Sequence, residues 1–178
     1  VHEDREADGL VLDASVRDNL VLGELGTFSR AGVIDRHALE TEAKARLERS
    51  GIVPQDLDLP VRALSGGNRQ KVVVARALAR APHVAALVLS QPTRGVDMAG
   101  AKAIHAAIAQ AAGQMAGQVA GGGKAVLVVS ADLDELRALC DRILVMARGT
   151  ITADLAPDAP EARFGDAMLG AGNRGATP

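Results

Sequence analysis

The chain has 178 residues, 48% of them apolar, which is enough for one hydrophobic core of ordinary size. A net charge of -2 with both signs mixed along the sequence leaves no basic stripe, which argues against a nucleic-acid surface. No apolar run approaches the roughly 20 residues of a membrane helix and no signal peptide is visible, so association with a membrane would come through a partner. The single Cys140 excludes an internal disulfide and suits a reducing compartment.

The first half of the chain is predicted to be helical. A capping box that opens at Ser15 predicts a short helix over residues 15–22, and a loop rich in Gly, Ser and Thr follows over residues 23–33. Apolar residues that recur on one face predict a longer helix over residues 35–50. A third, mostly apolar helix is expected over residues 65–81.

The second half alternates strands with helices, which predicts a parallel sheet. The expected strands are the apolar run between Pro82 and Pro92 and residues 125–129, 143–146 and 150–155. The expected helices are residues 98–112, 133–139 and 164–169, with a glycine-rich connector over residues 113–124 and a disordered tail over residues 171–178. The apolar run before Pro92 is too short and too tightly bounded for a helix, so we expect a buried strand there.

The most informative block is Leu64-Ser65-Gly66-Gly67-Asn68, at the start of the third predicted helix. Ser65 can cap the helix or give its hydroxyl group to a phosphate oxygen, and the two glycines remove side chains that would hold an anion at a distance. A helix N-terminus also presents free N–H groups and the positive end of the helix dipole. An ordinary serine-capped helix is the alternative interpretation of Ser-Gly-Gly alone.

The longer pattern resembles the motifs of ATP-binding cassette (ABC) proteins. Residues 64–78 are similar to the LSGGQ signature and its helix, residues 85–91 to the Walker B strand, residues 92–97 to the D-loop, and residues 125–136 to the strand and helix of the H-loop. The resemblance implies a nucleotide site with ATP and Mg²⁺ in an assembled dimer of cassettes. The residues that it assigns to the nucleotide are Ser65, Gly66, Gly67, Asn68, Asp97 and Glu3.

Three positions depart from the family pattern. Ser90 stands where Walker B has the aspartate that orders Mg²⁺, and Gln91 stands where it has the glutamate that polarises water. Serine brings no charge to a metal, and glutamine cannot take a proton. Ala131 stands where the H-loop has a histidine that contacts the γ-phosphate. We therefore expect the site formed by this chain's own residues to be a poor hydrolase.

A P-loop with the pattern G-x-x-x-x-G-K-[ST] is missing from residues 1–178. The string Gly121-Gly122-Gly123-Lys124-Ala125 lacks the Ser or Thr and precedes a strand, so we interpret it as a flexible connector. The first residues resemble the Q-loop region of sugar and nucleoside importers, with Glu3 in the glutamine position. The chain is therefore expected to start partway through a cassette, with the P-loop upstream.

The predicted fold is an α/β P-loop NTPase fragment of the ABC type. Residues 1–82 would form a Q-loop remnant and the helical subdomain, and residues 83–170 the C-terminal part of the RecA-like parallel-sheet core. As a set, the motifs resemble the second cassette of simple-sugar and nucleoside importer ATPases, which fuse two cassettes in one chain. That resemblance implies three partners: a second cassette, transmembrane permease subunits and, indirectly, a substrate-binding protein. It places the chain at the cytoplasmic face of the membrane.

Two classes of function follow from this resemblance. The chain is part of the energising ATPase of an importer, donating its signature to the partner cassette's ATP, or it is a non-hydrolytic structural or regulatory half or a truncated gene fragment. A soluble ABC protein of translation or DNA repair fits less well, because those resemble the signature without the Gln-Pro-Thr-Arg-Gly-Val-Asp sequence at residues 91–97.

The isolated chain is predicted neither to bind ATP usefully nor to hydrolyse it, because the P-loop supplies most phosphate contacts and Ser90 and Gln91 replace the acidic pair. Phosphate release by the purified chain, measured against a blank, tests this. Turnover in the usual enzyme range of about 1 per second or more would contradict it.

Overall fold

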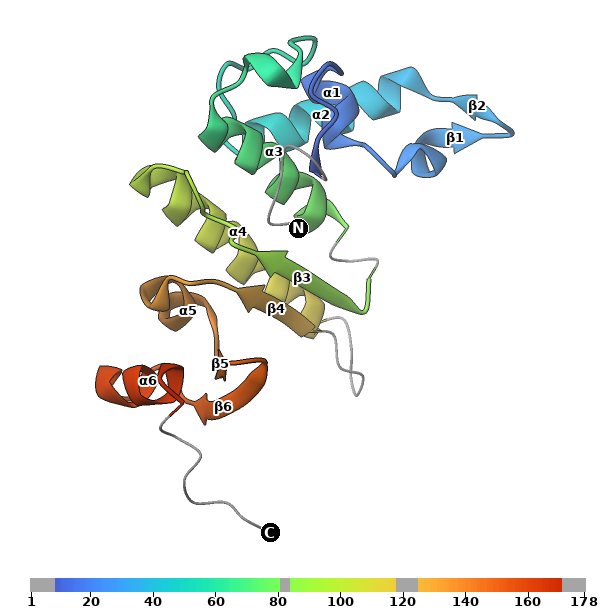
Figure 1. Ribbon diagram of the computed structural model, residues 1–178. Helices are drawn as coiled ribbons and strands as arrows, with labels where there is room; N and C mark the ends of the chain where they lie inside the picture. The colour runs from blue at the N-terminus through green and yellow to red at the C-terminus, as the bar shows by residue number, and fades with distance from the viewer. Residues whose placement is uncertain (1–8, 81–83, 118–124, 171–178) are drawn as a thin grey trace. The chain divides into compact units, whose positions relative to one another are not determined.

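The computed structural model describes residues 9–80, 84–117 and 125–170, which form two compact units, Val1–Val129 and Ser130–Pro178 (Figure 1). The first unit contains α1 (Val16–Leu20), the 3-10 turn η2 (Leu25–Phe28), β1 (Ser29–Arg30), β2 (Val33–Ile34), α2 (Arg36–Arg49), the 3-10 turn η3 (Val61–Ala63), α3 (Gly66–Ala79), β3 (Ala86–Ser90), α4 (Met98–Gly117) and β4 (Ala125–Val129). The second contains α5 (Leu133–Leu139), β5 (Ile143–Ala147), β6 (Thr150–Leu155) and α6 (Glu161–Met168).

Local capping signals position the helices of the first unit. Ser15 Oγ accepts a hydrogen bond from Asp18 N at 3.0 Å and starts α1, and Asp35 Oδ1 accepts from Ala38 N at 3.0 Å and starts α2. Gly51 follows α2 with a φ of 57°, a left-handed conformation that costs glycine little. The predicted helices over residues 15–22 and 35–50 are thereby confirmed with small shifts of their ends.

The three helices α1, α2 and α3 gather around one apolar core, as Figure 1 shows for the upper part of this unit. Val72, Val73 and Ala75 supply the α3 side of this core. Their partners from α1, α2 and the connecting segments are Leu10, Val16, Leu20, Leu47, Ile52, Val61 and Leu64. These side chains are all aliphatic, so this core is built without aromatic residues.

A buried asparagine organises the segment that leads into this core. Asn19 is 1% exposed, and its Oδ1 accepts from Val11 N at 2.9 Å while its Nδ2 donates to Val11 O at 2.9 Å and to Ser15 O at 3.0 Å. A buried amide is tolerated because its groups are paired in this way. The backbone just before the signature loop bonds to this segment, since Val61 N donates to Ala14 O at 3.0 Å.

A charged cluster joins the loop after α1 to the two longer helices. Arg46 on α2 is 6% exposed and donates two hydrogen bonds to the Glu24 carboxylate, at 2.9 and 3.0 Å. Arg80, at the end of α3, donates to Glu24 from its Nε at 3.2 Å. Burial by itself raises the pKa of Glu24, but the hydrogen bonds and charges of Arg46 and Arg80 outweigh burial and hold this pKa below its usual value.

Strands β3 and β4 pair in parallel, with Leu87 opposite Val126 and Leu89 opposite Val128. Leu87 and Leu89 are buried, whereas Val88 and Leu127 on the other face are about half exposed. This alternation gives the two-stranded sheet one buried face and one exposed face. The parallel pairing predicted for these two strands is confirmed.

The second unit is an antiparallel hairpin, β5–β6, with α5 and α6 as its helices. Phe164 of α6 is 1% exposed and packs against Ile143, Val145 and Leu155 of the hairpin. The guanidinium carbon of Arg137 lies 5.2 Å from the centre of the Phe164 ring. The core of the second unit therefore contains one of the two phenylalanines of the chain, unlike the aliphatic core around α3.

Several sequence predictions differ from the structure. Helix α4 continues to Gly117, five residues beyond the predicted end, because alanine-rich sequence propagates a helix through isolated glycines. Residues 23–33 are not only loop but include η2 and β1. The last helix covers Glu161–Met168 rather than residues 164–169, and β5 and β6 are antiparallel rather than part of a parallel sheet, since a tight turn at Arg148–Gly149 joins them.

Among the described residues, no helix is both long and apolar enough to cross a membrane.

Replacing Glu24 by Gln is predicted to lower the free energy of unfolding of the first unit by roughly 1.5–3 kcal/mol near pH 7, because charged hydrogen bonds to Arg46 and Arg80 are lost. The pKa of Glu24 is lower in the folded state, so its contribution is complete above the unfolded value of 4.5 and disappears as the pH falls through the folded value. Denaturant titrations at several pH values would show the two proteins converging only in acid. Asp13→Asn, which breaks the exposed pair with Arg62, serves as the control.

Candidate functional site

The signature loop, residues 64–68, is held in place by the residue before it and by α3. Leu64 is 3% exposed and anchors the loop in the helical core. Arg69 turns back from the first turn of α3 and donates to Leu64 O from Nε and to Arg62 O from Nη2, both at 3.0 Å. The loop therefore has a fixed backbone although Ser65 is exposed.

Ser65 is the N-cap of α3, with φ -62° and ψ 158°. Its Oγ accepts two hydrogen bonds from one residue, from Asn68 N at 3.3 Å and from Asn68 Nδ2 at 3.0 Å. Val53 N donates to Asn68 Oδ1 at 3.1 Å, which requires the amide oxygen to face Val53 and the amide nitrogen to face Ser65. Because both lone pairs of the Ser65 hydroxyl are taken, its hydrogen is left to donate outward.

The N–H groups of Gly66 and Gly67 have no acceptor in the part of the chain that the structure describes. They belong to the first turn of α3, whose amide groups lack carbonyl partners within the helix. Together with the Ser65 hydroxyl they provide three donors at the positive end of a 14-residue helix. This donor set fits the oxygens of a phosphate group.

The strand that precedes the predicted catalytic positions ends in a strained turn. Ser90 is the last residue of β3, and Gln91 adopts φ 46°, in the left-handed region. Gln91 N donates to Val129 O at 2.7 Å, so this turn is fixed to the end of β4. Neither residue brings a negative charge to the end of the strand.

Gln70, on α3, holds the same turn from the other side. It is 3% exposed, and its Nε2 donates to Gln91 O at 3.2 Å and to Pro92 O at 2.8 Å. The sequence placed Gln70 within the signature helix without a role. Its position three and four residues before Val73 and Val74, on the apolar face of the helix, could have marked it as a buried polar residue. The contact joins the signature helix to the end of β3.

The turn over residues 91–97 packs closely against α3. A Cβ atom on Gly67 would lie 3.4 Å from Gly95 O and 3.6 Å from Val96 Cα. The carboxylate of Asp97 is held in place, because its Oδ1 accepts a hydrogen bond from Gly100 N at 2.7 Å and so caps α4. The predicted D-loop aspartate is therefore exposed but engaged in holding the start of that helix.

Ala131 lies in the second unit, exposed, between β4 and α5. The adjacent Asp132 caps α5, accepting from Asp134 N at 2.9 Å and from Glu135 N at 3.2 Å. A methyl group at position 131 offers neither a hydrogen bond nor a charge. Cys140, at the end of α5, is half-buried, and burial together with Asp141 and Glu135 raises the pKa of its thiol, which makes it a poor nucleophile.

Three of the predicted features fall outside the described residues: Glu3, the glycine-rich string before Ala125, and the tail over residues 171–178. No group of three or more His, Cys, Asp or Glu side chains that could hold a metal ion occurs among the residues that are described. Mg²⁺ prefers carboxylate oxygens and water, whereas Ser90 and Gln91 supply only neutral groups. The residues present at the Walker B position therefore do not fit a magnesium site.

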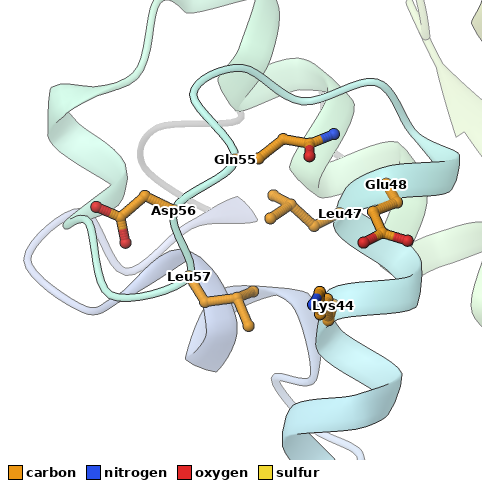
Figure 2. A pocket seen from close by; sticks show the side chains of 6 residues that line it. All are labelled: Lys44, Leu47, Glu48, Gln55, Asp56 and Leu57. Atoms are coloured by element: carbon orange, nitrogen blue, oxygen red, sulfur yellow. The ribbon is translucent and has the colours of Figure 1, made fainter.

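A shallow hollow of about 210 Å³ lies between α2 and the loop over residues 55–57 (Figure 2). Lys44, Leu47 and Glu48 line it from α2. Gln55, Asp56 and Leu57 line it from the loop. It contains no residue of the signature loop or of the 91–97 turn, so it is separate from the candidate site.

Comparison with known proteins identifies relatives of this sequence, although no protein-family model matches it. The chain is 40% identical over 157 residues to the ribose import ATP-binding protein RbsA of Chelativorans sp. (strain BNC1), covering 88% of this chain and 29% of that protein. It is 39% identical over 155 residues to ribose import ATP-binding protein RbsA 1 of Rhizobium etli, covering 87% and 28%. The chain thus spans less than a third of the length of these curated relatives.

Solved structures show the same fold. A dimeric post-hydrolysis state of an ATP-binding cassette bound to ADP and Pi matches with a TM-score of 0.67 at 22% identity, covering 84% of this chain and 60% of that one. A second dimeric structure, of a bacterial ABC transporter cassette, matches with a TM-score of 0.66 at 21% identity and the same coverage. The predicted α/β fold of a P-loop NTPase of the ABC type is confirmed.

Gly100→Ala is predicted to destabilise the first unit by about 1–3 kcal/mol, because the new Cβ would lie 2.5 Å from Val96 Cγ1 and 2.8 Å from Asp97 Oδ1. Gly67→Ala is the matched control, since its Cβ would make ordinary contacts and alanine favours a helix over glycine by roughly 1 kcal/mol. Thermal unfolding of both variants tests this. Equal melting temperatures for the two would show that the start of α4 is not tightly packed.

Proposed function

We propose that this chain, which is homologous to part of the ATP-binding subunits of ribose importers, belongs to the ATPase of an ABC importer for sugars or nucleosides. The observation that carries the proposal is the signature loop, where Ser65 and the N–H groups of Gly66 and Gly67 provide donors to a phosphate group. The chain acts by presenting this loop to an ATP molecule that a second cassette binds. It is an enzyme only within that assembly.

Asn68 acts on the phosphate through Ser65. Its two hydrogen bonds to Ser65 Oγ, at 3.0 and 3.3 Å, occupy the acceptor sites of the hydroxyl and direct the remaining hydrogen outward. A hydroxyl fixed as a donor stabilises a phosphate oxygen without reorganising when charge develops there. The bond from Val53 N to Asn68 Oδ1 supports this orientation.

The chain's own nucleotide position is proposed to hold ATP with little or no turnover. Phosphoryl transfer depends on positioning and on neutralising charge, and Ser90 and Gln91 bring neither a carboxylate for Mg²⁺ nor a base for water. Ala131 cannot contact a γ-phosphate. Asp97 belongs to this site as the residue that fixes the turn next to it, through its bond to Gly100 N.

The partners follow from this division of labour. The second cassette supplies the P-loop and the Mg²⁺ ligands for the ATP that this chain's signature contacts. Permease subunits hold both cassettes at the cytoplasmic face of the membrane, and a substrate-binding protein delivers the sugar or nucleoside. Support comes from the relatives, whose names describe import of ribose and, for a protein of Agrobacterium fabrum at 38% identity, of ribose, galactose or methyl galactoside.

A non-hydrolytic regulatory half is the second candidate. The neutral residues at Ser90 and Gln91 favour it, because they remove the charged groups of hydrolysis from this chain. The two candidates differ in whether the signature loop is needed for ATP turnover by the assembled complex.

In the assembled importer, Gly67→Asp is predicted to reduce the ATPase rate by about 100-fold or more, because a carboxylate at the N-terminus of α3 repels the γ-phosphate that the loop should stabilise. Gly67→Ala controls for the added Cβ, which the structure accommodates. Gln91→Ala should reduce the rate far less. Steady-state phosphate release measures all three.

If Gln91→Ala is as damaging as Gly67→Asp, this cassette hydrolyses ATP itself and the asymmetric assignment is wrong. If neither variant changes the rate, the chain is the regulatory half.

A further inference from the structure

The buried polar side chain of Gln70 links α3 to the turn over residues 91–97. Its Nε2 donates to two carbonyl oxygens, Gln91 O and Pro92 O, with one hydrogen for each bond, so the amide nitrogen faces the 91–97 turn. Burial makes these bonds costly to lose, because an unpaired amide or carbonyl group would remain away from water. The side chain therefore fixes the distance between α3 and the end of β3.

The turn that Gln70 contacts holds a conformation that its sequence does not favour. Gln91 has φ 46°, and a residue other than glycine persists there only where the surrounding structure fixes it. The surrounding bonds are Gln91 N to Val129 O at 2.7 Å, Arg94 N to Gln91 O at 3.2 Å, and the two from Gln70. A change in this turn consequently requires a change at Gln70.

Gln70 lies five residues after Ser65, within the first turns of the same helix. Gly67 lies beside the same turn, since a Cβ atom added to it would lie 3.4 Å from Gly95 O and 3.6 Å from Val96 Cα. The start of α3 and the 91–97 turn are thus adjacent at Gly67 and joined by hydrogen bonds at Gln70. Because α3 is a continuous helix that begins at the signature loop, a displacement of Gln70 would also displace this loop.

We propose that Gln70 is a positioning residue that couples the turn at Gln91–Pro92 to the signature loop, so that a conformational change at one is passed to the other. Its functional consequence rests on the proposed function. A cassette that holds ATP without hydrolysing it can still report that occupancy to the signature loop that it presents to its partner. Gln70 would then act in regulation rather than in chemistry.

The coupling is tested by a double-mutant cycle read by amide hydrogen exchange. Gln91→Val loosens the turn, because a β-branched residue disfavours φ 46°, and it leaves the main-chain carbonyl of residue 91 in place. We expect the amides of Asn68 and Arg69 to exchange about tenfold faster in this variant, and to change less than about twofold when Gln70→Met is already present. An equal effect in both backgrounds overturns the coupling through Gln70.

Gln110→Met, at an exposed position of α4, is the matched control and should leave this exchange unchanged. A merely structural role for Gln70 would instead speed exchange throughout the first unit. If Gln70→Met does not fold, the side-chain amide hydrogens of Gln70 in the unmodified protein provide the measurement. They should exchange slowly and shift in Gln91→Val, and rapid exchange or an unaltered resonance overturns the proposal.

The ATPase rate of the assembled importer separates this proposal from the proposed function. Gln70→Met should lower the maximal rate about tenfold with little change in the KM for ATP, since it alters the position of the signature loop rather than its donors. A rate that neither Gly67→Asp nor Gln70→Met changes overturns the proposed function, while the exchange cycle still decides the coupling. A rate lost with Gly67→Asp but retained with Gln70→Met overturns the coupling.

Discussion

Helix α3 must bury its middle while leaving its first N–H groups free, and the rest of the first unit is arranged around that requirement. Val72, Val73 and Ala75 lie in the helical core, whereas Gly66 and Gly67 have no acceptor among the described residues. Unpaired helix N–H groups are ordinarily satisfied by side chains or water. Leaving two of them beside an exposed serine creates an anion-binding position from the backbone alone.

Three consecutive polar residues hold the start of α3 in place, each through a different contact. Asn68 fixes the Ser65 hydroxyl, Arg69 fixes the backbone before it, and Gln70 fixes the helix against the turn after β3. Each is paired to a backbone carbonyl or to a neighbouring side chain, so the first turn of α3 is preorganised before any ligand binds. Preorganised donors are more effective than mobile ones because they need no reorientation when charge develops.

An ion pair of the first unit serves the fold and includes no residue at the end of β3. The buried Arg46 and its partly buried partner Glu24 join α2 to the end of α3. The end of β3, where the resemblance places catalytic carboxylates, carries Ser90 and Gln91 instead. Fold and site therefore point to the same division: a maintained signature loop and a neutral Walker B position.

The sequence by itself determined the helix caps and the parallel strands at residues 86–90 and 125–129, because these depend on local residue types and short spacings. The roles that it assigns to Ser65, Gly67, Ser90 and Gln91 stay predictions. Only the tertiary structure decided that Gln70 contacts Gln91 and Pro92 and that Asn68 faces Val53. Those contacts join residues whose separation along the chain carries no periodic signal, so packing alone brings them together.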